Sequence, residues 1–340
     1  MFCRRISGAV DALMHAKKWC GHLYNWFDAC THKELGTPYI SLVDSGNLLA
    51  SLYVLLGALK HFSLMEDVQA QIQVLIDQTD LKAFYRPGNR LMAIGYFPKT
   101  GKFTENEFDL YMSEARTASF LAVARGEVGV EHWNALSRAL IEQDRHIGML
   151  SWTGTAFEYF MPSLWFGART GSYLHEALSF ARERQIADGE RGGLWGNSES
   201  AYYGFDARGN YQYRAFGAPS LALAAEQANG SVFAPYATFL MSQMAGKTGA
   251  ILENLKKFQQ IGGYGKLGYY DAVDVNARGR YRVVKNHMSH HQGMILGAVC
   301  NILRGGLLED FFFSDPQMRA AKLLLEEKIP FYEKDWRAER

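Results

Sequence analysis

The sequence contains no long hydrophobic run. No stretch reaches the roughly 18 apolar residues that a membrane span requires, and the N-terminal segment MFCRRISGAVDALMHAKKWC lacks the apolar centre of a signal peptide. Charge of one sign is not concentrated either, because 36 Lys and Arg are balanced by 35 Asp and Glu, for a net charge of +1. Without a basic run, we do not expect nucleic acid as a partner.

Cysteine is scarce, and several catalytic motifs are missing. Cys3, Cys20, Cys30 and Cys300 have neither CxxC spacing nor a paired pattern, which argues against a zinc site or a disulfide framework. Reduced, mostly buried thiols would fit a cytoplasmic location. The phosphate-binding motif GxxxxGK and the nucleophilic-serine motif GxSxG do not occur, so kinase and esterase functions lose their main support.

The chain is instead rich in apolar and aromatic residues. Hydrophobic residues make up 48% of it and charged residues 21%, enough for a large core, and aromatic residues reach 14% beside 33 glycines. Apolar residues recur with helical spacing along most of the chain. This periodicity predicts helices over residues 6–27, 45–62, 65–79, 105–125, 130–143, 156–171, 173–187, 217–228, 233–244, 247–258, 287–304 and 316–328.

The ends of these segments and the weak strand signals complete the predicted fold. Helix starts are expected at Asp44-Ser45 and at Thr104 with Glu107, and helix ends at Gly189 and Gly305. Short hairpins are expected within 92–99 and 267–283. No linker or low-complexity tract divides the chain. About twelve helices with Gly- and aromatic-rich loops predict an all-α (α/α)6 barrel, a single domain over residues 1–340, with its active cleft in loops at one end.

Residues 195–217, WGNSESAYYGFDARGNYQYRAFG, combine one carboxylate with many rings. Glu199 lies among Gly, Ser and Asn residues, and four tyrosines follow it. A sugar packs its C–H face on an aromatic ring while a carboxyl group acts at the glycosidic bond. The stretch therefore predicts a carbohydrate-active enzyme with Glu199 in its cleft; a surface loop is the alternative. The neighbours predicted to bind substrate are Trp195, Tyr203, Tyr211, Tyr213 and Arg214.

Two further glutamates lie in apolar surroundings. Glu114, in FDLYMSEARTASFLAVA, would be desolvated, and the resulting rise in pKa suits a general acid. The alternative is a structural ion pair with Arg116. Glu158, in SWTGTAFEYFMPSLW, is either an active-site carboxylate or a partner in a buried network. Trp152 of the same motif is predicted to bind substrate.

Two aspartates and a histidine cluster complete the candidates. Asp271 follows Tyr269 and Tyr270, two rings predicted to bind substrate, which indicates either substrate hydrogen bonding or a turn for Asp271. Asp44 in LVDSGNLLASL is either a helix cap or part of a cleft wall. His287, His290 and His291, followed by Gln292, have the i, i+3, i+4 spacing of one helix face. No HExxH pattern or cysteine accompanies them, so contacts with sugar hydroxyls or cleft carboxylates are favoured over a metal.

Several of these motifs occur in one order that resembles a known family. They are HLYNWFDACT, YISLVDSGNLLASL, MSEARTASFLAVARGEVGVEHW, SWTGTAFEYFMPSLW, WGNSESAYY, GNYQYRAFGAP, APYAT, GYYDAVD and NHMSHHQGMIL. Together they resemble the glycoamylase-like region of cyclic β-1,2-glucan synthases, which is associated with cyclisation and is related to bacterial endo-β-1,2-glucanases. The resemblance extends from about residue 17 to 304.

The resemblance implies an (α/α)6 barrel, no metal or other cofactor, and linear or cyclic β-1,2-glucan as the partner. Making a β-linkage from a β-linkage requires net retention, for which a nucleophile and an acid/base stand about 5–5.5 Å apart. Carried over by motif, Glu114 is the acid/base and Glu199 the nucleophile. Glu158, Asp271, Asp44 and the histidines then bind substrate or support the site.

Two departures from the family pattern leave alternatives open. The position of Asp271 is often glutamate in the synthases, and the chain lacks their glycosyltransferase and phosphorylase-like modules and membrane spans. It is therefore either an excised soluble part of a membrane-bound synthase or a stand-alone enzyme. The alternatives are an endo-β-1,2-glucanase with a retaining or an inverting outcome, an enzyme for another glucan, a non-catalytic glycan-binding module, and a helical scaffold for protein partners.

Overall fold

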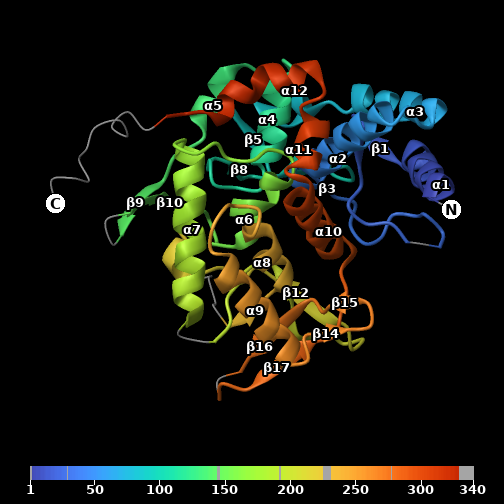
Figure 1. The fold of residues 1–340 in the computed structure, drawn as a ribbon. Helices are drawn as coiled ribbons and strands as arrows, with labels where there is room; N and C mark the ends of the chain where they lie inside the picture. Colours follow the sequence, from blue (N-terminus) through green and yellow to red (C-terminus); the bar gives the residue numbers. More distant parts are fainter. Residues whose placement is uncertain are drawn as a thin grey trace. The chain divides into compact units, whose positions relative to one another are not determined.

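The structure, a computed structural model, describes residues 2–328 except 29, 144–145, 191–192, 225–230 and 277. The described residues are rich in helix, with twelve α-helices, and also contain several β-hairpins (Figure 1). Contacts divide the chain into two compact units. The first is Met1–Tyr111, Ala115–Ser137 and Leu308–Lys322, and the second is Met112–Glu114, Arg138–Leu307 and Leu323–Arg340. The single domain expected over residues 1–340 stays a prediction.

The first unit is built around a long apolar helix, α2 (Leu42–His61). Ser41 caps it by accepting a hydrogen bond from the backbone N–H of Asp44, so the helix starts three residues before the expected Asp44-Ser45. Gly46 allows α2 to approach α4 (Arg116–Ala124) closely, because a Cβ there would lie 2.7 Å from Cβ of Ala118. The other helices are α1 (Phe2–His15), α3 (Glu66–Gln78), α5 (Val130–Ala135), α11 (Leu307–Phe312, from Leu308 on) and α12 (Pro316–Ala320).

Helix α2 is also the one helix in the described part of the chain that is long and apolar enough to cross a membrane. Its mean hydropathy over the best window is 1.5, and 61% of that window is buried inside the protein. A helix at the centre of a core passes the same test of length and composition. The burial of α2 therefore accounts for its apolar character without a membrane.

Short strands cover other parts of the first unit. A three-stranded sheet joins β3 (Ile40–Ser41), β6 (Gly95–Phe97) and β7 (Lys102–Phe103), and a second joins β4 (Tyr85–Arg86), β5 (Leu91–Ala93) and β8 (Glu107–Phe108). Strands β1 (Lys18–Trp19) and β2 (His22–Leu23) pair with each other. The expected hairpin within 92–99 is wrong, because β5 and β6 belong to different sheets.

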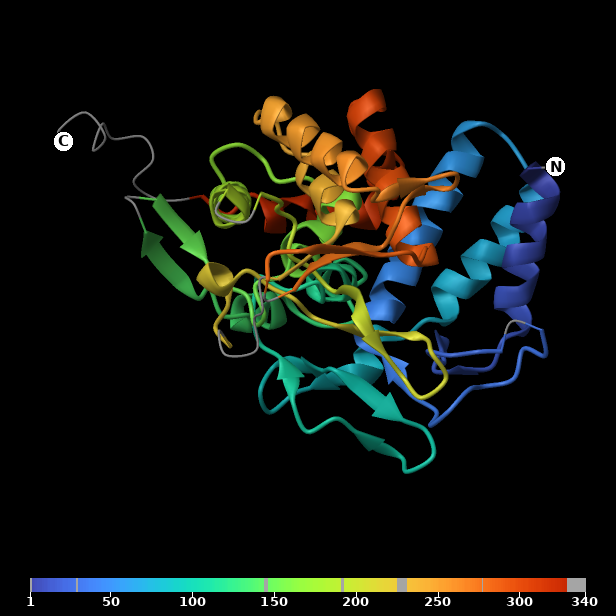
Figure 2. The ribbon, with the colours of Figure 1, turned by 90° about the horizontal axis from the view of Figure 1, so that it is seen from below.

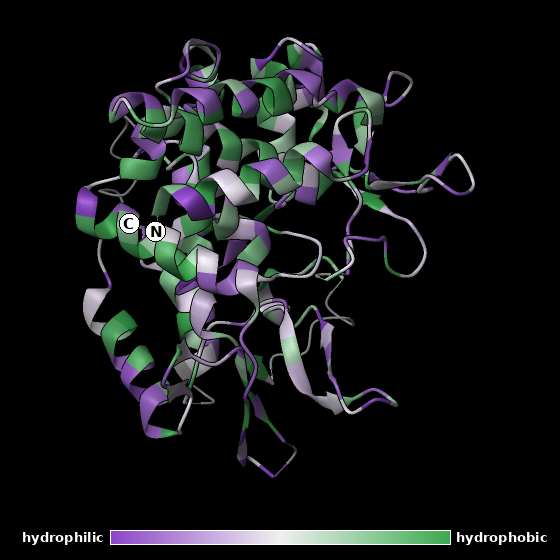
Figure 3. Ribbon diagram, turned by 90° about the vertical axis from the view of Figure 1, so that its right-hand side faces the viewer, coloured by the Kyte–Doolittle hydropathy of each residue, from purple (hydrophilic) through white to green (hydrophobic). Residues whose placement is uncertain are grey.

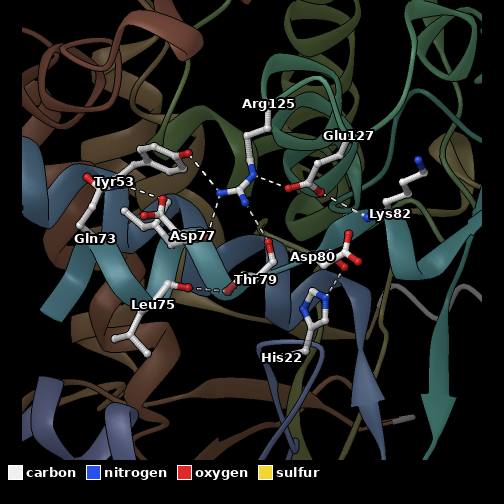
Figure 4. Close-up of polar contacts among 11 residues, drawn as sticks. His22, Tyr53, Gln73, Leu75, Asp77, Thr79, Asp80, Lys82, Arg125 and Glu127 are labelled. Atoms are coloured by element: carbon white, nitrogen blue, oxygen red, sulfur yellow. Dashed lines mark hydrogen bonds and ion pairs between the residues drawn. The ribbon is translucent and has the colours of Figure 1, made fainter.

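Arg125, at the end of α4, joins several segments of the first unit (Figure 4). Its guanidinium donates to the backbone oxygens of Ile76 at 3.0 Å and Thr79 at 2.8 Å, and to the Tyr53 hydroxyl at 3.2 Å. It also forms an ion pair with Glu127, and 11% of the Arg125 side chain and 15% of the Glu127 side chain are exposed. Because both charges are nearly buried, each depends on the other for compensation.

We expect Arg125→Ala to lower the free energy of unfolding by about 3 kcal/mol, because it leaves the Glu127 carboxylate buried and unpaired. Chemical denaturation followed by circular dichroism measures this. Arg125→Ala/Glu127→Ala should recover part of the loss, since neither charge then remains. Arg169→Ala is the control, because Arg169 is 68% exposed in its pair with Glu326 and its loss should cost less than about 1 kcal/mol. Equal losses in both single variants would contradict the prediction.

The second unit combines helices with hairpins. Its helices are α6 (Ala156–Phe160), α7 (Tyr173–Glu190), α8 (Pro235–Met241), α9 (Thr248–Gln260) and α10 (Ser289–Arg304). Its hairpins are β9 (Leu140–Gln143) with β10 (His146–Met149), β11 (Ser200–Phe205) with β12 (Tyr211–Arg214), β14 (Tyr264–Gly265) with β15 (Gly268–Tyr269), and β16 (Ala272–Val275) with β17 (Tyr281–Val284). In Figure 2 the β9–β10 hairpin, in green, lies beside α7.

A buried cluster lies between the helices and strands of the second unit. It consists of Leu194, Phe233, Phe258, Tyr269 and Val273, contributed by loops, by α9 and by strands β13 (Val232–Phe233), β15 and β16. Strand β16 pairs on one side with β13 and on the other with β17. Figure 3 shows green hydrophobic residues along part of most helices and purple hydrophilic residues along the rest, as expected for helices that cover a core.

Several predicted segment ends are wrong. The predicted helix 6–27 ends at His15, 105–125 begins only at Arg116 and 130–143 ends at Ala135, because short strands occupy the remaining residues. Residues 217–224 of the predicted helix 217–228 contain only a 3₁₀ turn, Pro219–Leu221, and 225–228 lie outside the described residues. Short strands and buried loops produce apolar spacings that helical periodicity also fits.

Some of the predictions for turn and cap residues are confirmed and others are wrong. Gly305 ends α10 with φ +63°, as predicted, whereas Gly189 lies within α7. The Thr104 hydroxyl bonds the backbone of Gly95 and Asn106 in place of a helix start. The hairpin expected within 267–283 is confirmed as β16–β17. The four cysteines are free, but Cys3, Cys20 and Cys30 are exposed, so the expectation of mostly buried thiols is wrong.

Candidate active site

Glu114 is a carboxyl group whose pKa the protein raises. It lies in the segment Met112–Glu114, which belongs to the second unit, and Ser113 donates a hydrogen bond of 3.2 Å to its Oε2. Burial, followed by the charges of Glu158 and Glu199, raises the pKa of Glu114 to about 8. At neutral pH Glu114 therefore carries a proton that it can donate. The same charges show that the three glutamates lie close together.

Glu158 is held in position by hydrogen bonds from its own segment. It is only 5% exposed, and its carboxylate accepts from the hydroxyls of Ser151, Thr153 and Thr155 and from the backbone N–H groups of Thr153 and Thr155, at 2.8–3.0 Å. With Thr155 it forms the capping box at the start of α6. These contacts favour the buried-network interpretation, because five donors of the same segment already hold the carboxylate.

Glu199 is a half-buried carboxylate held at the start of β11 by two tyrosines. The Tyr213 hydroxyl donates to its Oε2 at 3.4 Å. The Tyr236 hydroxyl donates to the backbone oxygen of Glu199 at 2.9 Å and lies 2.7 Å from Oγ of Ser198. Burial, followed by Tyr236 and the Glu199 charge, raises the pKa of Tyr213, so its hydroxyl stays a donor. The carboxylate of Glu199 is thereby oriented from the β12 side.

Asp271 connects the segment that carries Glu199 to a buried histidine. Its Oδ2 accepts from the backbone N–H of Ala201 at 2.8 Å, and its Oδ1 lies 2.6 Å from Nδ1 of His291. The His291 ring stacks on Tyr236 with centroids 4.0 Å apart and lies 6.1 Å from the ring of Tyr213. Asp271 is 2% exposed and His291 1%. The pair therefore fixes the surroundings of both tyrosines that contact Glu199.

The three histidines do not share one helix face. Helix α10 begins at Ser289, so His287 precedes it, and the ring of His287 lies 5.0 Å from that of Tyr270. His290 is exposed, whereas His291 is buried against Tyr236. The Gln292 amide donates to the backbone oxygen of Tyr269 at 3.2 Å. Among the residues that the structure describes, no group of three or more His, Cys, Asp or Glu could hold a metal ion.

Two of the aromatic residues predicted to bind sugar lie in the core. Trp195 is 5% exposed, and Tyr269 is 9% exposed within the cluster around Phe258. Rings buried to this degree offer little surface on which a sugar could stack. Trp152, 54% exposed, is open to solvent, and Arg214 is exposed with its guanidinium 5.3 Å from the Phe216 ring.

Asp44 belongs to the first unit, in the first turn of α2. The Asn25 amide donates to its Oδ2 at 2.6 Å, and burial raises its pKa. With His22 and Tyr24 these two residues line a pocket of about 260 Å³ within that unit. The helix-cap role belongs to Ser41, and the cleft-wall interpretation of Asp44 stays a prediction.

Sequence reasoning missed Tyr236 and Ser198. Both lie in motifs that support the resemblance, APYAT and WGNSESAYY, but neither motif marks them as contacts of Glu199. A tyrosine within the apolar run APYATFL has the pattern of a core residue, and Tyr236 is indeed only 1% exposed. Its function comes from the hydroxyl, whose partners are 37 and 38 residues away in the chain.

Residues 107–316 match the family model Glycoamylase, whose description is "Putative glucoamylase". Because this match covers more than half of the chain, the protein belongs to the glycoamylase family. A cyclic β-(1,2)-glucan synthase, NdvB of Rhizobium meliloti (strain 1021), is 38% identical over 257 residues. The match covers 74% of this chain but 9% of the synthase, so the chain spans only a small part of that relative.

Solved structures share the fold at low sequence identity. The endo-β-1,2-glucanase of Chitinophaga pinensis, in complex with sophorotriose and glucose, has a TM-score of 0.68 and 18% identity, with 96% of this chain and 82% of that chain covered. The endo-β-1,2-glucanase of Talaromyces funiculosus, in complex with sophorose, has a TM-score of 0.66 and 13% identity over 85% of this chain and 62% of that one. The expected family resemblance is confirmed.

Proposed function

We propose that this protein cleaves β-1,2-glucan and transfers the cut end to an acceptor. The observation that carries the proposal is the buried, protonated Glu114 beside the oriented Glu199 carboxylate. A proton donor and a carboxylate are the two groups that glycoside chemistry requires. The relatives support the substrate, because their names refer to β-1,2-glucan synthesis and cleavage. We also propose that the helices close into an (α/α)6 barrel forming one domain, in the cytoplasm.

In the proposed reaction Glu199 attacks C1 of the sugar, while Glu114 donates its proton to the glycosidic oxygen, so that the leaving chain departs as an alcohol. Glu114 then removes a proton from the acceptor hydroxyl, which displaces Glu199 from C1. A sugar acceptor gives transfer or ring closure, and water gives hydrolysis. The two inversions at C1 restore the β-configuration. This route requires the two carboxyl groups to stand about 5–5.5 Å apart.

Other residues are proposed to bind the sugar units around this bond. Asp271 and His291 would act by holding the surroundings of Glu199, because both side chains are almost fully buried. The remaining residues of the second unit that we propose to contact substrate are Trp152, Tyr213, Arg214, Tyr270, His287, His290 and Gln292. For Asp44, in the first unit, substrate contact stays a prediction from the sequence.

Incubation with β-1,2-glucan, starch and β-1,3-glucan, followed by NMR in the first minutes, tests the function. We expect products from β-1,2-glucan alone, with newly formed ends in the β-configuration. Initial α-configured ends would indicate an inverting hydrolase, which is the second candidate because solved relatives are named endo-β-1,2-glucanases. No product from any glucan, with binding retained, would indicate a non-catalytic glycan-binding module.

In the pH profile of kcat/KM, we expect Glu158→Gln to move the decline on the alkaline side to lower pH. Glu114 must be protonated to act as the acid, so activity falls as pH rises through its pKa, near 8 in the parent protein. Removing the Glu158 charge removes one cause of that raised pKa. Gln also fits the third helical position of a capping box, so α6 should persist.

The pH dependence of kcat/KM on β-1,2-glucan checks this prediction. Glu253→Gln is the matched control, because the side chain of Glu253 is 69% exposed on α9 and carries the same charge. Its alkaline limb should stay in place. If the Glu158→Gln enzyme keeps full activity and its kcat/KM declines at the same alkaline pH as in the parent enzyme, Glu158 does not set the proton affinity of Glu114.

A further inference from the structure

The β11–β12 hairpin carries aromatic rings beyond the one that contacts Glu199. At its far end, the ring centroids of Tyr203 and Phe205 are 5.3 Å apart, those of Phe205 and Tyr211 4.8 Å, and those of Tyr203 and Tyr211 6.1 Å. We name these three residues the ring cluster. The hairpin is drawn in yellow in Figure 2. The active-site chemistry proposed above does not use the ring cluster.

The ring cluster is open to solvent. Phe205 is 48% exposed and Tyr203 39%, while Tyr211 packs partly against the buried residues around Phe216. Single exposed rings are common on protein surfaces, but adjacent rings that stay exposed together mark a binding surface. Burying such rings under a ligand contributes about 25 cal/mol per Å² of apolar area.

The rings are held in place by the structure beneath them. The backbone N–H of Tyr203 donates to Oδ2 of Asp274 at 3.1 Å. At the turn, Oδ1 of Asp206 accepts from the N–H groups of Arg208 and Asn210, both at 2.8 Å. A ligand that stacks on the cluster therefore does not have to order a loose loop, which reduces the entropic cost of binding.

The strand register connects the ring cluster to Glu199. In the hairpin Phe205 pairs with Tyr211 and Ala201 pairs with Tyr213. Tyr211 and Tyr213 are two residues apart on β12, so their side chains lie on the same face, roughly 6.5–7 Å apart along the strand. Because the Tyr213 hydroxyl donates to Glu199, the rings form a strip that leads away from that carboxylate.

The charges around the strip indicate a neutral ligand. The guanidinium of Arg282 lies 4.7 Å from the Tyr203 ring centroid and forms an ion pair with Asp274 at 3.4 Å. The positive charge that lies over Tyr203 is therefore compensated, so a polyanion gains little there. Aromatic faces without net charge fit the C–H faces of neutral sugars.

We propose that the ring cluster binds glucose units of β-1,2-glucan beyond those at Glu114 and Glu199, so that the enzyme selects long chains over short ones. This inference rests on the proposed function. Each aromatic contact of this kind contributes about 0.5–1.5 kcal/mol. The ring cluster lies outside the residues proposed to act on the reacting bond, so its contacts lower KM for chains long enough to reach them and leave kcat unchanged.

The test compares kcat/KM on β-1,2-linked oligosaccharides of about five and about twenty glucose units. The parent enzyme should prefer the longer chain, and Phe205→Ala and Tyr203→Ala should each lower kcat/KM on that chain about tenfold, through KM, which corresponds to about 1.4 kcal/mol. Activity on the short chain should stay within about twofold. Phe205→Trp keeps a ring and should preserve the preference for the long chain.

Tyr264→Ala is the matched control, because Tyr264 is 52% exposed on β14 of the same unit but lies outside the ring cluster. It should leave both rates unchanged. An equal loss on both chain lengths in the cluster variants, or an unchanged preference, would overturn the inference. A parent enzyme that cleaves neither oligosaccharide would instead refute the proposed function, so the two failures are distinguishable.

Discussion

Replacing Glu199 with alanine should lower kcat on β-1,2-glucan at least about 10⁴-fold, because the proposed nucleophile is lost and water cannot take its position against C1. Tyr213 and Tyr236 hold Glu199 in place, so the isosteric Glu199→Gln should keep the fold and lose activity to a similar extent. Initial rates, with melting temperature as a check on folding, measure both variants.

Adding azide to the Glu199→Ala variant tests the role of Glu199 more specifically than the loss of rate does. A small anion fits the space left by the carboxylate, so azide should restore turnover of an aryl β-sophoroside with a good leaving group and give an α-glycosyl azide. Glu253→Gln again serves as the control, since its exposed charge on α9 takes no part in the reaction. Near-parent activity of Glu199→Gln on β-1,2-glucan would exclude Glu199 from the chemistry.

Replacing Glu114 with glutamine should lower kcat on β-1,2-glucan about 10²–10⁴-fold, the usual contribution of a positioned general acid. The variant should also lose the decline in kcat/KM near pH 8, because that decline reports the ionisation of Glu114. Substrates with good leaving groups need no proton for departure, so their first step should be much less affected. The pH profile and the ratio of rates on the two substrate types measure this.

The Glu114→Ala variant also distinguishes a retaining from an inverting route. In a retaining enzyme, azide intercepts the sugar bound to Glu199 and gives a β-glycosyl azide, since the attack inverts C1 a second time. An inverting enzyme forms no such intermediate and cannot give this product. If Glu114→Gln kept both the parent rate on β-1,2-glucan and the limb near pH 8, another group would have to be the acid.

The sequence was sufficient for the family and for the carboxylates that the structure brings together. Glu114 and Glu199 were recognisable because each stands out chemically, one in an apolar run and the other among rings, and their charges do interact. Their roles stay predictions. Glu158 stood out for the same reason, yet only the hydrogen bonds show that its charge is held by the turn before α6.

Burial of rings was not predictable from residue type. Trp195 and Tyr213 both lie in the aromatic stretch around Glu199, but one is 5% and the other 41% exposed. The difference comes from packing. Trp195 lies against Gly189 of α7, and its backbone N–H donates to Asn254 while its backbone oxygen accepts from Asn254. Tyr213 stands on a strand whose side chains alternate between two faces. Such contacts join residues far apart in the chain, which local patterns do not encode.

The sequence pattern also did not determine where helix α10 begins. The i, i+3, i+4 spacing of the histidines indicates one face only if all three lie within a helix, and α10 begins two residues after His287. The hairpin β11–β12 was missed because the bulge between Tyr202 and Phe205 breaks the alternation that marks a strand.

The capping box of α6 contributes both to the start of the helix and to the electrostatic surroundings of Glu114. Thr155 caps the helix, and its hydroxyl, with those of Ser151 and Thr153, donates to the Glu158 carboxylate, whose negative charge contributes to the raised pKa of Glu114. A substitution chosen only to tune helix stability, such as Thr155→Ala, would therefore also remove one of the groups that hold this charge in place. The stability of α6 and the pKa of Glu114 are thus linked through Thr155.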